Sequence, residues 1–154
     1  MVRVKVGDEL ILSPVKARVR LDFKGNSKPG RFLFGGRASD KIAEEVREQQ
    51  VAMLRNVPIQ GIQVENIDMS QEVYLLPDEN DHHEVAYAPV LLDLVADSVE
   101  DLLKFIARED FRKIEILEPA EMYMSRHDLE RMLFQVNEEV RKFKTALERR
   151  YRNQ

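Results

Sequence analysis

The stretch VKARVRLDFK, residues 15–24, alternates apolar and polar side chains without a break. Its apolar members are Val15, Ala17, Val19, Leu21 and Phe23, and its polar members are Lys16, Arg18, Arg20, Asp22 and Lys24. Successive side chains of a β-strand point to opposite faces of a sheet. This period of two therefore predicts a strand with one buried face and one face in water.

Shorter extended segments flank this strand on both sides. Residues 2–6 alternate before the Gly7-Asp8 turn, residues 10–12 form an apolar run, and residues 31–34 follow a cluster rich in Gly and Pro. We therefore expect the first quarter of the chain to form a small antiparallel sheet.

The pattern changes to a helical one after this sheet. Ser39 or Asp40 is placed to cap a helix over about 40–56, whose apolar residues share one broad face, and Pro58 lies just beyond its end. The segment Gly35–Ser39 is then predicted to form a turn between a strand and this helix.

A hairpin is predicted next. Residues 73–76 and 85–95 are extended and apolar, and an acidic loop lies between them. Pro89 has no N–H to donate, so we expect the longer strand to lie at a sheet edge or to be interrupted at that residue.

The order of the elements predicts an α+β fold with a mainly antiparallel sheet, helices on one face and a long C-terminal amphipathic helix. Asp97 or Ser98 opens a short helix as in a capping box, and residues 113–117 alternate as a strand. We expect a body over 1–120 and the long helix over 121–154. The predicted body consists of a basic β-rich start at 1–37, the helix at about 40–56, and strands with the short helix over 60–118.

The last helix carries the sharpest pattern in the sequence. Ser125 and Asp128 form a second capping pair at its start. Its apolar residues recur at alternating intervals of four and three, which is the spacing of a heptad seam. The seam consists of Leu129, Leu133, Val136, Val140, Phe143 and Leu147.

Such a helix, over about 126–151, would be about 39 Å long, whereas a globule of this chain length has a radius of gyration of about 15 Å. Three surfaces could cover the seam: the chain's own sheet, a second copy of the chain, or a different protein. We expect a small binding or assembly protein that forms a homodimer, or docks on another protein, through these six residues.

Composition excludes several classes of site. The chain of 154 residues has no Cys, which rules out disulfides, Cys-ligated zinc, iron–sulfur clusters and thiol nucleophiles. No apolar run is long enough to cross a bilayer, and the first twelve residues lack a signal-peptide core. We therefore expect a soluble cytoplasmic protein without a membrane, cofactor or metal requirement.

Charge is distributed unevenly. Residues 1–37 hold nine Lys and Arg against three acids, net +6, and residues 38–100 hold three against fourteen, net −11. We expect these two segments to fold against each other and neutralise their charges. A basic arm that binds an anionic ligand or nucleic acid is the alternative.

That alternative has its own candidate residues. Backbone amides at Gly35-Gly36 could hold an anion at a helix N-terminus, with positive charge from nearby arginines. The candidate anion-binding residues are Arg18, Arg20, Arg31, Gly35, Gly36 and Arg37. A plain strand-to-helix turn and a solvated basic sheet face are the simpler interpretations, and nucleic acid is not the favoured partner.

No catalytic or metal-binding motif is recognisable. Six residues with metal-binding side chains lie between 78 and 84, but adjacent histidines on an extended strand point to opposite faces, so a solvated hairpin tip is the favoured interpretation. A Gly-x-Ser-x-Gly nucleophile motif is also missing from the sequence. Paired carboxylates are too numerous for one pair to be chosen, so enzymatic activity stays open but unsupported.

Overall fold

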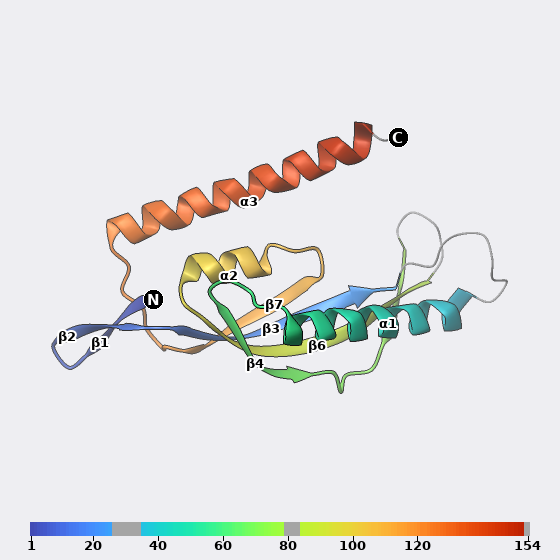
Figure 1. The fold of residues 1–154 in the computed structure, drawn as a ribbon, viewed down its shortest axis with the longest axis horizontal. Helices are drawn as coiled ribbons and strands as arrows, with labels where there is room; N and C mark the ends of the chain where they lie inside the picture. The colour runs from blue at the N-terminus through green and yellow to red at the C-terminus, as the bar shows by residue number, and fades with distance from the viewer. Residues whose placement is uncertain (26–34, 79–83, 153–154) are drawn as a thin grey trace.

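The computed structural model describes residues 1–25, 35–78 and 84–152, and for residues 35–38 it describes the helical backbone alone. The architecture is α+β with antiparallel sheets, as the sequence predicts, and the long helix α3 lies at the C-terminus (Figure 1). The elements are β1 (Val2–Val6), β2 (Glu9–Ser13), β3 (Val15–Lys24), α1 (Gly35–Asn56), β4 (Ile62–Asp68), β5 (Tyr74–Pro77), β6 (Glu84–Ala96), α2 (Val99–Ile106), β7 (Phe111–Glu118) and α3 (Arg126–Arg152).

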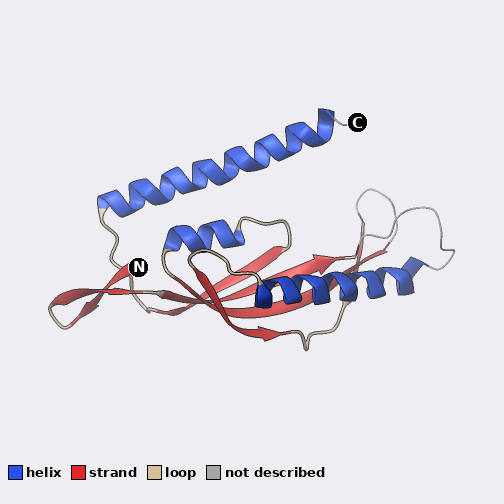
Figure 2. Cartoon of the chain, viewed as in Figure 1, coloured by secondary structure: helices blue, strands red, loops and turns tan. Residues whose placement is uncertain are grey.

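The alternating strand β3 lies in the interior of a five-stranded sheet. The strand order is β4-β6-β3-β7, and β5 pairs with the other part of β6. All five apolar side chains of β3 are buried, and they pack on residues of α1 and α2 such as Val51 and Phe105. The helices α1 and α2 thus cover one face of the sheet (Figure 2). The polar side chains of β3 alternate with the buried ones and therefore lie on the opposite, open face.

One expectation for the first quarter of the chain is wrong. Only β1 and β2 form a small separate sheet, whereas β3 pairs along its whole length with β6. The reason is that the apolar face of β3 needs helices above it, and those helices come from later in the chain. Residues 31–34, predicted as a further strand, lie outside the described residues.

The prediction for Pro89 is also wrong, because β6 is an interior strand that continues through this residue. Its carbonyl oxygen accepts a hydrogen bond from Arg47 Nη1 at 3.3 Å, and the same nitrogen donates to Gln71 O at 2.9 Å. On that side β4 pairs only as far as Leu91, and β5 begins at Tyr87. The backbone nitrogen of Pro89 therefore faces the gap between β4 and β5, where no neighbouring strand has a carbonyl that would accept a hydrogen bond from it.

The helix α1 begins earlier than the sequence predicts, at Gly35, so neither Ser39 nor Asp40 is its cap. Ser39 is buried inside the helix, where its Oγ donates to Gly25 O at 3.2 Å and accepts from Ala86 N at 3.0 Å. A Cβ at Gly25 would lie 2.4 Å from Ser39 O, so only glycine fits there. Ser39 therefore connects α1 to β6 and to the end of β3.

The remaining helix starts are as predicted. Ser98 caps α2 and accepts from Asp101 N at 3.1 Å. In α3 the capping pair is reciprocal: Asp128 N donates to Ser125 Oγ at 3.1 Å, and Ser125 N donates to Asp128 Oδ2 at 2.9 Å. The helix α3 lies beyond α2, on the side of α2 away from the sheet (Figure 1).

Candidate functional site

The apolar seam of α3 is not covered by the chain's own sheet. None of the described residues of α3 is buried. Five of the six seam side chains are exposed, among them Leu133 at 58%, Val140 at 60% and Phe143 at 59%, and Leu147 is half-buried. A soluble protein rarely leaves a continuous apolar stripe of this kind in water, so the seam is a candidate interaction surface.

The seam does not lie on the side of α3 that faces the body. Arg131 and Gln135 line a cleft of about 560 Å³ between α2 and α3, and Arg131 also binds Glu100 of α2, so these two residues mark the body-facing side. Each residue of an α-helix is rotated by about 100° from the one before it. On this basis, the mean direction of the residues that contact the body lies about 110° around the helix axis from the mean direction of the seam. The residues in contact with the body are Asp128, Arg131, Gln135 and Arg150. The orientation of α3 therefore leaves the seam free for another surface.

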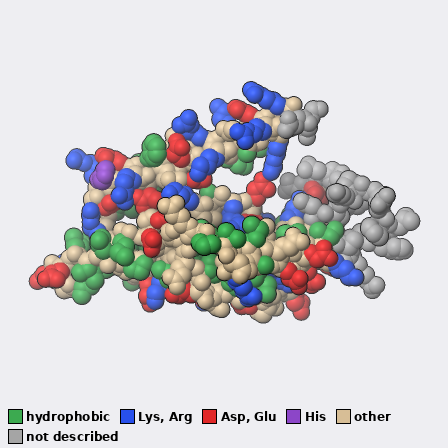
Figure 3. Space-filling model, viewed as in Figure 1, with side chains coloured by type: hydrophobic (Ala, Val, Ile, Leu, Met, Phe, Trp, Pro, Cys, Tyr) green, Lys and Arg blue, Asp and Glu red, His purple; other side chains and the backbone are tan. Residues whose placement is uncertain are grey.

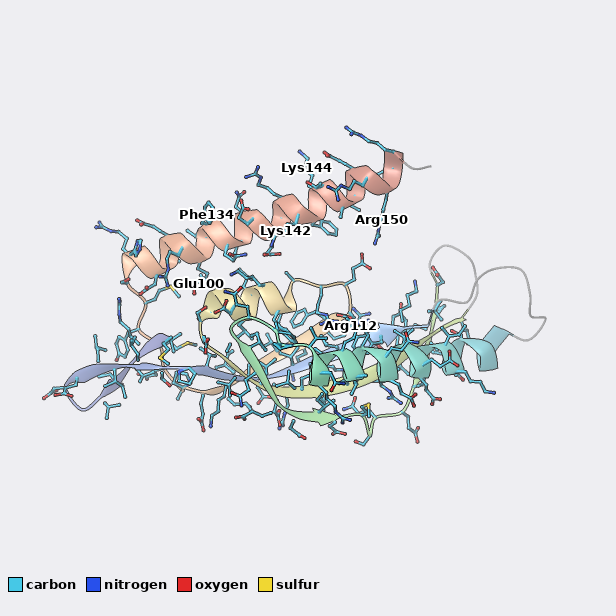
Figure 4. All side chains as sticks on the ribbon, in the orientation of Figure 1. Glu100, Arg112, Phe134, Lys142, Lys144 and Arg150 are labelled. Carbon is cyan, nitrogen blue, oxygen red and sulfur yellow. The ribbon has the colours of Figure 1, made fainter. Side chains whose placement is uncertain are left out.

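Ion pairs hold α3 in this orientation. Arg131 Nη2 lies 3.0 Å from Glu100 Oε1 on α2, Arg150 Nη2 lies 3.0 Å from Glu109 Oε1, and Arg3 Nη1 lies 3.0 Å from Asp128 Oδ2. Arg150 points from the end of α3 toward the body, and Glu100 lies on α2 below the first half of the helix (Figure 4). These contacts connect both ends of α3 to the rest of the chain and use none of the seam residues.

The start of α3 is also stabilised by charge. The hydroxyl and backbone N–H of Ser125 donate hydrogen bonds to Asp128 and lower the pKa of its carboxyl from the ordinary value, with a smaller contribution from Arg3. An ionised acid in the first turn interacts favourably with the helix dipole. The seam therefore begins on a well-anchored turn.

A second apolar surface lies beside the start of α3. The projecting β1–β2 hairpin exposes Val6, Leu10 and Leu12. Next to it, a cavity of about 380 Å³ is lined by four of the six methionines of the chain, Met1, Met122, Met124 and Met132. Sequence patterns did not single out this surface, because its residues come from the two ends of the chain.

The basic face of β3 is paired with acids. Arg18 donates to both oxygens of Asp93 at 2.7 and 3.0 Å, and these bonds raise the pKa of Arg18 and lower that of Asp93. Lys16 lies 3.1 Å from Glu118, whose hydrogen bond raises the pKa of the lysine. Arg18–Asp93 joins the basic first segment of the chain to the acidic second one, and so does Lys24 at 3.8 Å from Asp78.

The other candidate anion-binding residues are placed as follows. Arg20 is bonded to Asp22 at 2.8 Å. Arg31 lies outside the described residues, as do residues 79–83 of the acidic loop. Gly35 and Gly36 form the first turn of α1 rather than a preceding loop, and the side chain of Arg37 is not among those described. The two arginines whose side chains are described thus already have carboxylate partners.

A cluster on the open sheet face was not predicted. Asp22 is only 2% exposed, and besides Arg20 it accepts a hydrogen bond of 2.5 Å from Tyr74 Oη and lies 3.6 Å from Arg112 Nε. Burial first, and then the bond to Asp22, raises the pKa of Tyr74. Tyr74 stacks on Tyr87 with ring centroids 5.5 Å apart, and Arg112 lies over the same ring. These contacts tie β3, β5 and β7 together.

Among the described residues, no group of three or more His, Asp and Glu side chains is arranged to hold a metal ion. None of the described helices has the length and hydropathy needed to cross a membrane. No protein-family model, no curated protein and no solved structure matches this chain.

Proposed function

We propose that this chain is an assembly protein that self-associates through the exposed seam of α3. The observation that carries the proposal is that six apolar side chains at heptad spacing lie on a side of α3 that the body does not cover. A heptad seam is complementary to a second copy of itself, because the same knobs and holes recur along both helices.

The energetics are sufficient for a dimer. Burying a large apolar side chain fully is worth about 1.5–3 kcal/mol, and the seam side chains are already about half covered by their own helix. Twelve such side chains in a dimer would therefore contribute roughly 9–18 kcal/mol, against association costs of about 4–15 kcal/mol. The helix α3 is already formed in the single chain, so its backbone loses little ordering entropy on association.

The described part of the basic N-terminal quarter offers less support for an anion-binding function. Arg18 and Arg20 each bind a carboxylate of the same chain, and a phosphate would have to displace it. The apolar seam has no such internal partner among the described residues. Self-association through α3 is therefore the better-supported function.

A tryptophan placed in the seam tests this proposal, because the chain has no natural Trp. Phe143→Trp should emit at shorter wavelength as the protein concentration rises from nanomolar to micromolar, since association removes the ring from water. Phe134→Trp is the control, because Phe134 is similarly exposed at 65% but is not part of the seam. If the emission of Phe143→Trp matches that of the control at every concentration, the seam is not an interface.

A further inference from the structure

The charge of α3 is strongly polarised along its length. Residues 126–139 carry two Lys and Arg against four acids, net −2, whereas residues 140–152 carry six against one, net +5. Lys and Arg side chains gather over the C-terminal end of the helix (Figure 3). The charges that face each other in a dimer of α3 therefore differ between a parallel and an antiparallel arrangement of the two helices.

In a parallel pair, the two basic halves would lie side by side and repel each other. Arg126 continues the seam at its N-terminal end, so in a parallel pair it would also face its own copy across the dimer. In an antiparallel pair, the acidic half of one helix lies along the basic half of the other. We infer that the dimer, if the self-association proposed above holds, is antiparallel, with its two-fold axis passing close to residue 138.

The spacing of the seam fits this axis. With the axis at residue 138, every seam side chain faces another one in the second copy, so no apolar side chain is left without an apolar partner. The facing pairs are Leu129 with Leu147, Leu133 with Phe143, and Val136 with Val140. Each of these pairs then occurs twice because of the symmetry.

The residues beside the seam agree with the same register. Glu130 and Lys144 both follow a seam residue on the same side of the helix, and the axis brings Glu130 of one copy next to Lys144 of the other. Met132 and Ala146, on the opposite flank, also become neighbours and extend the apolar contact. One like-charged contact, between the two copies of Glu139, lies at the centre. The repulsion between these two carboxylates is reduced because Lys142 Nζ lies 2.8 Å from the Glu139 carboxylate of the same chain.

Single cysteines test the orientation, because the chain has none of its own. Leu129→Cys and Leu147→Cys are purified separately, with tags of different length, and oxidised alone or after mixing and exchange of subunits. In the antiparallel dimer each cysteine lies about 27 Å from its own copy, since 18 residues separate the two levels along the helix. A disulfide needs Cα atoms within about 7 Å. We therefore expect covalent dimers in the mixture, all of them between the two variants, and none with either variant alone.

The outcomes separate this inference from the proposed function. Covalent dimers of Leu129→Cys alone would show a parallel pair and overturn the antiparallel arrangement while leaving self-association intact. A dimer mass with no disulfide in any combination would overturn both, since the contact would lie elsewhere on the molecule. A monomer mass for all samples would overturn the proposed function itself.

Discussion

Replacing Leu133 and Val140 together by glutamate should convert the protein from a dimer to a monomer. Each dimer would lose four apolar side chains from its centre, which removes about 4 kcal/mol of association free energy at roughly 1 kcal/mol each. This loss weakens the dimer about a thousandfold before charge is counted. Four carboxylates would also be forced into an apolar contact. Sedimentation velocity should show the doubly substituted chain at half the mass of the unsubstituted protein.

The matched control is Phe134→Glu with Thr145→Glu. These substitutions add the same charge to the same helix at exposed positions that are not part of the seam. The control should retain the dimer mass. Loss of the dimer in both variants would mean that added negative charge, rather than the seam, decides association.

Asp22→Ala should be the most destabilising change on the open face of the sheet. It removes a buried carboxylate that three side chains contact and leaves the hydroxyl of Tyr74 and the guanidinium of Arg20 without that acceptor. Because Arg20 and Arg112 are partly exposed and can bind water, we expect a loss of about 3 kcal/mol rather than the full cost of a buried unpaired charge. Thermal unfolding should then shift down by about 6–12 °C.

Asp93→Ala provides the comparison. Asp93 also binds an arginine of β3 through both oxygens, but this pair lies at the surface, where an ion pair contributes about 0–1 kcal/mol. The melting temperature of the Asp93→Ala variant should therefore change by no more than a few degrees. Equal shifts for the two variants would show that the Asp22 cluster contributes no more than a surface ion pair.

The sequence was informative wherever a local period decided the structure. Alternation placed the apolar residues of β3 on the buried face, and the Ser125–Asp128 pair located the start of α3. Heptad spacing identified a face of α3 that the structure leaves exposed. In each case the structural feature depends on residues within one helix or strand, so it can be predicted from a single sequence.

Features that depend on distant segments could not be predicted. Ser39 has the composition of a helix cap, but its hydroxyl bonds instead to Gly25 and Ala86, which are far from it in the chain. Pro89 is tolerated in an interior strand only because β4 and β5 leave a gap beside it. The partner of Asp22, Tyr74, is 52 residues away, and no spacing rule connects them. For the same reason, the direction in which the seam faces became known only from the contacts of α3.

Light scattering of the unsubstituted protein over a range of micromolar concentrations tests the central claim most directly. The chain mass is 18.0 kDa, and a dimer held by α3 should scatter as a particle of about twice that mass. A single species at 18.0 kDa across the whole range would contradict the account, since the exposed seam would then have no second copy to cover it.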